Sequence, residues 1–167
     1  MVKNLYSDYK FKIEEIFSNE TLKAYHNIKV ICKKFDNSII LSSINGGGDY
    51  TLYLQDRFFS FTIDNETKRI GAFDGDLSFS KMLSANIKLP HYIKDVILAL
   101  NTIDDLPAGC GGYINFNNKK ILYDESQKIL QIGDIDNSEI TYSFLSNAFT
   151  QIKKEKITGL IFTGIEI

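Results

Sequence analysis

The sequence predicts an α+β fold, a mostly antiparallel β-sheet of short strands with two or three short helices. Between Tyr50 and Gly133 the apolar residues recur largely at every second position, which is the periodicity of a half-buried strand. Turn residues separate these runs, while a few other segments carry apolar residues at helical spacing. Strands and helices do not alternate regularly enough to predict a parallel sheet.

The N-terminal region is expected to form a helix followed by two strands. Between Leu5 and Phe17 the apolar residues fall at helical spacing, which favours a helix. The alternation of Tyr9, Phe11 and Ile13 leaves a strand as the alternative. Two strands are then predicted at residues 25–35 and 39–44, joined by a turn at 36–38.

The middle of the chain predicts three strands and one short helix. The strands are expected at 50–54, 59–63 and 70–79, and Gly75 in the last of them indicates a bulge or a bend. From Ile93 to Leu100 the apolar residues stand at positions i, i+3, i+4 and i+7, which favours a helix. A strand through residues 96–98 is the alternative.

The C-terminal region predicts a three-stranded meander, followed by a strand, a helix and a last strand. The meander is expected through residues 113–116, 121–123 and 129–133, because Asn117-Asn118 and residues 124–127 are turn signals. Strands are expected at 140–144 and 157–165, and a helix between them at 145–152.

Length and composition indicate one folded domain over residues 1–167. Domains of about 100–200 residues are common, and 44% apolar with 24% charged residues is ordinary for a globular protein. The chain opens without the pattern of a signal peptide and has no apolar run long enough for a membrane span. We therefore expect a cytoplasmic protein that does not enter a membrane.

The net charge of −2 is unevenly distributed along the chain. Residues 36–105 contain ten acidic and six basic residues, a local charge of −4. Nucleic-acid binding needs concentrated lysine and arginine, so an acidic middle argues against a nucleic acid as direct partner. It is compatible with a basic protein partner, although such charges also commonly just solvate turns.

Several motifs that resemble catalytic or ligand sites lack a required residue. Cys110 lies in a glycine-rich turn, but a catalytic thiol needs a neighbouring base, and His26 and His91 are the only imidazoles. The triple glycine at residues 46–48 lacks the lysine of a P-loop and is expected to be a mobile hairpin loop. Residues 134–145 lack the glycine and the final glutamate of an EF-hand. No metal site and no cofactor are therefore expected.

Six acidic residues lie at or near predicted turns, and they allow three interpretations. They can be solvated turn residues, an acidic rim that faces a partner, or a carboxylate pair for acid–base catalysis. The six are Asp64, Glu66, Asp74, Asp76, Asp104 and Asp105.

In overall character the chain resembles the immunity proteins of bacterial contact-dependent growth-inhibition and polymorphic-toxin systems. The segments that carry the resemblance are Gly109-Cys110-Gly111-Gly112-Tyr113-Ile114-Asn115-Phe116 and Ile129-Leu130-Gln131-Ile132-Gly133-Asp134. The resemblance implies a non-enzymatic protein that neutralises a cognate toxin domain by tight binding. It has no diagnostic motif and assigns no binding residue.

An acidic inhibitor would associate fast with a nuclease toxin, whose substrate groove is basic. We therefore expect Asp74, Asp76, Asp104 and Asp105 to form the charged part of the binding face. One alternative is a small enzyme that uses a carboxylate pair or Cys110, and another is a β-domain that binds a small ligand. The sequence does not indicate the oligomeric state.

Overall fold

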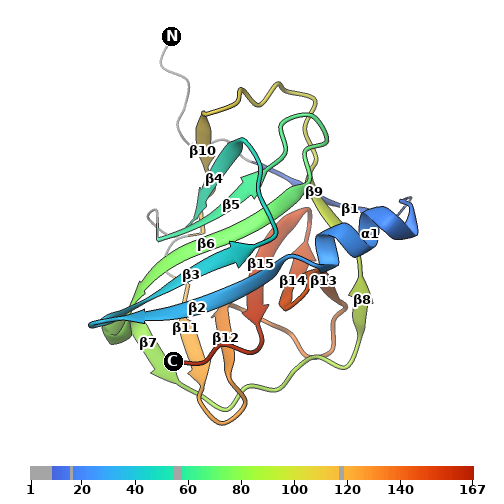
Figure 1. Ribbon diagram of the computed structural model, residues 1–167. Coiled ribbons are helices and arrows are strands. Elements are labelled where there is room, and N and C mark those ends of the chain that lie inside the picture. The colour runs from blue at the N-terminus through green and yellow to red at the C-terminus, as the bar shows by residue number, and fades with distance from the viewer. Residues whose placement is uncertain (1–8, 16, 55–57, 117–118) are drawn as a thin grey trace.

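The computed structural model describes residues 9–15, 17–54, 58–116 and 119–167 (Figure 1). Strands make up 51% of the described residues and helical turns 7%, so the described fold is mostly β. The described residues contain three sheets and one α-helix. The prediction of an α+β fold with two or three helices is therefore wrong.

The first sheet has six strands in the order β10-β4-β5-β6-β3-β2. All neighbours pair antiparallel except β10 and β4, which are parallel. The strands are β2 (Lys29–Phe35), β3 (Ser38–Ile44), β4 (Tyr50–Leu54), β5 (Phe59–Ile63), β6 (Ile70–Ser78) and β10 (Gly111–Tyr113). The strands predicted in this region are confirmed, with β2 beginning later than expected.

Gly75 in β6 allows a close contact and does not form a bulge. The register of this sheet shifts between Thr62 and Ile63 instead. A Cβ atom at Gly75 would lie 2.5 Å from Cδ1 of Phe59. Glycine is therefore needed here because a core ring packs directly against the backbone.

The second sheet has seven strands in the order β7-β11-β12-β15-β14-β13-β8. The two edge strands, β7 and β8, run parallel to their neighbours, and the inner pairs are antiparallel. The strands are β7 (Met82–Ser84), β8 (Ile93–Asp95), β11 (Ile121–Asp124), β12 (Ile129–Gly133), β13 (Thr141–Leu145), β14 (Ala148–Lys153) and β15 (Lys156–Phe162). A short 3-10 helix, η2 (Phe79–Lys81), connects β6 to β7.

The predicted three-stranded meander is correct only for its last two strands. β11 and β12 form the expected hairpin, whereas β10 belongs to the other sheet and pairs with β4. The turn predicted at residues 117–118 lies outside the described residues.

A two-stranded sheet of β1 (Phe11–Glu14) and β9 (Ile97–Leu100) closes one end of the molecule. The helix expected between Leu5 and Phe17 is therefore wrong for the described residues, and the strand alternative is confirmed. The α-helix, α1 (Asn19–His26), follows β1, and its N-cap Ser18 accepts a hydrogen bond from the Thr21 amide at 3.1 Å. α1 has eight residues, and no helix in the described part of the chain is long and apolar enough to cross a membrane.

Two further helix predictions are wrong because the segments are strands that are buried on both faces. All four residues of β9 are buried, and so are three of the six in β14, with two more half-buried. Such strands carry nearly continuous apolar residues, and a continuous run also satisfies helical spacing. The strand alternative at residues 96–98 is therefore confirmed, and the predicted helix at 145–152 is replaced by the β13–β14 hairpin.

The inner faces of the two large sheets pack together through phenylalanine rings. Phe73 of β6 lies 4.5 Å from Phe162 of β15 between ring centroids, and Phe61 of β5 lies 6.1 Å from Phe144 of β13. All four rings are at most 1% exposed. This aromatic layer is the centre of a core that also includes residues of β1 and β9.

A buried asparagine joins the open edge of β2 to the other sheet. Asn147, in the β13–β14 turn, accepts a hydrogen bond from the Val30 amide and donates to the Val30 carbonyl, both at 2.8 Å. Its side-chain amide also donates to the Thr163 carbonyl at 2.8 Å. The side chain thus takes the place of a neighbouring strand for one residue of β2.

The chain between β7 and β8 crosses the outer face of the seven-stranded sheet. Ile87 in this crossing segment is buried with Ile129 and Ile161 in a second, smaller apolar cluster. The Ile87 amide donates to the Asp124 carboxylate at 2.8 Å. This bond, with those from Ser126 and Gln127, holds the pKa of Asp124 well below its usual range. One sheet therefore has both faces covered.

Candidate protein-binding face

The outer face of the six-stranded sheet exposes apolar and charged side chains together, and we call this surface the open face. Alternation along the strands buries one side of the sheet and leaves the other toward solvent. Ile40 is 37% exposed, Ile44 43% and Phe35 65%. The open face is defined by Lys33, Phe35, Ile40, Ile44, Asp74 and Asp76.

Strand register places an acidic, an apolar and a basic residue in one row across this face. Asp76 of β6 lies opposite Ile40 of β3, and Ile40 lies opposite Lys33 of β2. Residues in register share a face, with neighbouring strands about 4.8 Å apart. Asp76 and Lys33 are thus roughly 10 Å apart at the backbone, and neither forms an ion pair with another described residue.

A second row leads from Asp74 toward the aromatic end of the sheet. Asp74 lies opposite Ser60 of β5, which lies opposite Tyr53 of β4. The Tyr53 ring stacks on Tyr113 of β10, with centroids 5.3 Å apart. The face therefore combines aromatic, hydroxyl and carboxylate groups, and of these the aromatic side chains are enriched in protein interfaces.

Asp74 is a half-buried carboxylate, and few hydrogen bonds offset the cost of removing it from water. Its Oδ1 accepts one long hydrogen bond, from the Ser43 amide at 3.4 Å. Burial raises the pKa of Asp74, and the bond from Ser43 offsets only part of this effect. The group keeps acceptor capacity for an incoming cation.

The structure does not bring the four predicted aspartates together. Asp74 and Asp76 share the open face, two positions apart on β6. Asp104 and Asp105 are exposed in the loop between β9 and β10. The amide of Gly109 in this loop donates to the Asp49 carbonyl at 2.7 Å, at the end of the sheet where β6 begins. Asp76 is six residues along β6 from that end, a separation of roughly 20 Å.

Two other acidic residues of the predicted set lie in the β5–β6 turn. Asp64 accepts hydrogen bonds from the amides of Thr67 at 2.7 Å and Glu66 at 3.0 Å. These bonds lower the pKa of Asp64, with the Thr67 amide as the largest cause. Asp64 therefore stabilises its own turn.

Cys110 is exposed beside β4, and neither histidine is placed to activate it. Its carbonyl accepts from the Thr51 amide at 3.2 Å. His26 lies at the Val96 carbonyl, 3.2 Å away, and His91 lines a depression near Gln127. A Cys110 nucleophile would therefore have no imidazole base. Gly109 has a φ of +74°, which confirms that glycine serves the turn geometry here.

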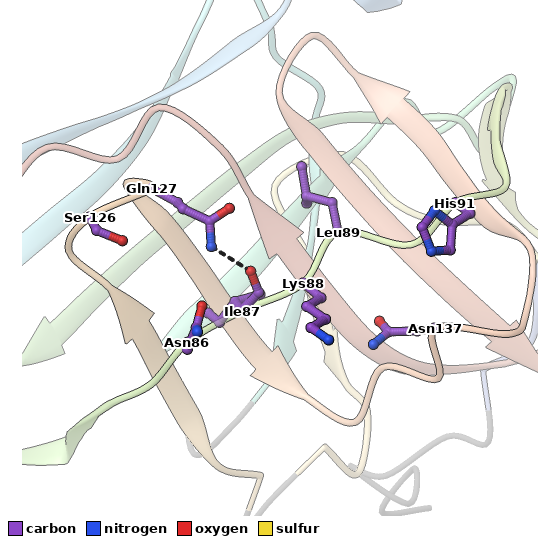
Figure 2. A pocket seen from close by; sticks show the side chains of 8 residues that line it. All are labelled: Asn86, Ile87, Lys88, Leu89, His91, Ser126, Gln127 and Asn137. Carbon is purple, nitrogen blue, oxygen red and sulfur yellow. Dashed lines mark hydrogen bonds between the residues drawn. The ribbon is translucent and has the colours of Figure 1, made fainter.

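A depression of about 540 Å³ lies beside the segment that crosses the seven-stranded sheet (Figure 2). Gln127 closes one end, because its side-chain amide donates to the Ile87 carbonyl at 2.6 Å. Lys88, His91 and Asn137 line the rest together with two further polar and two apolar residues. The alternative of a ligand-binding domain requires a deep apolar cavity, and this depression is not such a cavity.

The glycine-rich loop at residues 46–48 and the acidic loop that begins at residue 134 both have a structural role. A Cβ at Gly46 would lie 2.2 Å from the Gly71 carbonyl oxygen, so the first residue of the triple glycine packs closely against β6. Asp136 accepts from the amide and hydroxyl of Ser138 at 2.9 and 2.7 Å. No group of three or more potential metal ligands occurs among the described residues.

Four residues of the open face were not predicted as site residues from the sequence: Lys33, Phe35, Ile40 and Ile44. Ile40 and Lys33 were identified only as parts of strands, and their position beside Asp76 depends on the pairing of β2, β3 and β6. The sequence feature that could have indicated an exposed apolar surface is the spacing of Ile40 and Ile44, four positions apart on β3.

Comparison of the chain with protein-family models, with curated proteins and with solved structures finds no match.

Proposed function

We propose that this chain is a cytoplasmic binding protein that neutralises a cognate toxin domain by covering its active site or substrate groove with the open face. The observation that carries the proposal is the exposure of Phe35, Ile40 and Ile44 next to Asp74 and Asp76. Interfaces typically have an apolar centre with a polar rim. The crossing segment covers the corresponding face of the other sheet, so the open face is the large sheet surface that the described residues leave to a partner.

Charge supports a basic toxin, with a nuclease as the best-fitting class. A nuclease groove carries the lysines and arginines that bind phosphate. Asp74 and Asp76 would accept hydrogen bonds from such side chains, and charge-assisted bonds are stronger than neutral ones. The acidic segment of residues 36–105 would speed association by long-range attraction.

The experiment is a binding measurement with the protein domain encoded immediately upstream of this chain, once expression of that domain alone has been tested for toxicity. Replacement of both Asp74 and Asp76 by alanine is expected to slow association and to weaken affinity at least about tenfold. Replacement of both Asp104 and Asp105 by alanine is expected to change only the association rate, because their loop lies at the rim of the proposed interface. Alanine at Glu125 and Glu139, two exposed acids in the connections between strands of the other sheet, is the matched control. Unchanged binding by the Asp74 and Asp76 variant would place the toxin elsewhere.

Asp74→Asn is expected to stabilise the free protein at neutral pH while it weakens toxin binding. The folded-state pKa of Asp74 is raised, so its protonated form favours folding and this contribution is lost as pH rises through the folded pKa. The neutral asparagine amide does not ionise, so the variant does not lose this stability at neutral pH. Thermal unfolding should show a higher Tm than wild type at pH 7 and a smaller difference at pH 4. A lower Tm at pH 7 would mean that the carboxylate stabilises the fold.

A further inference from the structure

We infer that the open face is self-complementary, and that without a toxin it binds the open face of a second copy of this chain. The row across the face runs Asp76, Ile40, Lys33, from acidic through apolar to basic. A two-fold axis parallel to β3 and passing over Ile40 inverts this order in the partner. Each Asp76 then faces Lys33 of the other copy, and the two Ile40 side chains meet at the axis.

The exposed apolar residues fit the same axis. Ile40 and Ile44 both belong to β3, with exposed fractions of 37% and 43%, and both lie on the strand that the axis follows. A two-fold interface pairs each residue of the axis strand with its own counterpart. The apolar strip would thus be buried against itself and the charges would pair at its sides, the usual order of core and rim.

The charges in this row have no competing partner within the described protein. Neither Asp76 nor Lys33 takes part in an ion pair with another described residue. Their separation of roughly 10 Å prevents them from pairing with each other. Contact with a second copy would bring each within reach of an opposite charge.

Association through the open face is favoured over pairing along the part of the β2 edge that Asn147 leaves open. An antiparallel contact between two β2 edges would bring Lys33 and Lys34 of one copy against those of the other. Like charges in directly opposite positions are destabilising, and lysines on an edge strand prevent this kind of pairing. The second copy is therefore expected on the face and not on the edge.

The test is a charge exchange measured by sedimentation of the purified full chain over a range of concentrations. Wild type is expected to show a monomer–dimer equilibrium in the micromolar range. Asp76→Lys alone and Lys33→Glu alone should each weaken the dimer at least about tenfold, since each creates two like-charge contacts. The double variant, with both changes, should restore the dimer because the exchanged charges pair again.

Three outcomes would overturn the inference: a monomer at hundreds of micromolar, a dimer that the single variants do not weaken, or no recovery in the double variant. Circular dichroism of each variant verifies folding, and Glu125→Lys is the control for a charge change elsewhere. The inference does not rest on the proposed function. Because the experiment contains only this chain, its failure is distinguishable from a failure of the toxin measurement.

Discussion

Replacing Asn147 with alanine is expected to lower the free energy of unfolding by about 3 kcal/mol. The change would leave the Val30 amide and carbonyl, and the Thr163 carbonyl, without their hydrogen-bond partner. Val30 is fully buried, and an unsatisfied buried group costs about 1–3 kcal/mol. Urea denaturation followed by circular dichroism measures the difference.

Two further variants separate this contact from a simple loss of volume. Asn147→Asp keeps the size and the acceptor but turns a carboxylate toward two carbonyl oxygens, so it should be at least as destabilising at pH 7. Asn137→Ala, at an exposed loop position, should change stability by less than about 0.5 kcal/mol. A loss below about 1 kcal/mol in Asn147→Ala would show that the link between β2 and the second sheet is weak.

Phe73→Ala is expected to destabilise the protein by about 4 kcal/mol, because it opens a cavity where the two large sheets meet. The Phe73 ring is fully buried and contacts Phe59, Phe61 and Phe162, with centroids 5.8, 5.5 and 4.5 Å away. Denaturant titration should show a lower midpoint with an unchanged slope.

The matched control is Phe35→Ala, which removes the same ring from a position that is 65% exposed. This variant should keep stability within about 0.5 kcal/mol of wild type. If both substitutions lowered stability equally, Phe73 would not be at the centre of the core.

The sequence predicts the strands of this fold well where one face is buried and the other is open. β4 and β5 alternate strictly between buried and half-buried residues, and both were predicted within their observed bounds. β9 and β14 were mistaken for helices because their burial does not alternate. Local periodicity carries no information about what covers the second face of a strand.

The local sequence pattern does not predict which distant segments of this fold pair with each other. β10 follows β9 in the chain but joins β4 across more than 50 positions, so the sequence wrongly predicts a third strand in the meander. Asn147 has no signal of its own, since an asparagine between Ser146 and Ala148 resembles an ordinary turn residue. Its role arises only because β2 presents an unpaired amide and carbonyl at that point.

The candidate site also has a part that local periodicity predicts and a part that depends on strand pairing. The spacing of Asp74 and Asp76 places them on one face of any strand, so their proximity was predictable. Their neighbours Ile40 and Lys33 depend on the register of three strands, and the distance to Asp104 and Asp105 depends on where a loop ends.

We propose that this chain neutralises a toxin domain by binding through its open face. The decisive measurement is the toxic activity of the domain encoded immediately upstream, titrated with the purified chain. Complete inhibition is expected at one chain per toxin, and weaker inhibition when Asp74 and Asp76 are both replaced by alanine. Full toxin activity in the presence of excess chain would contradict this proposal.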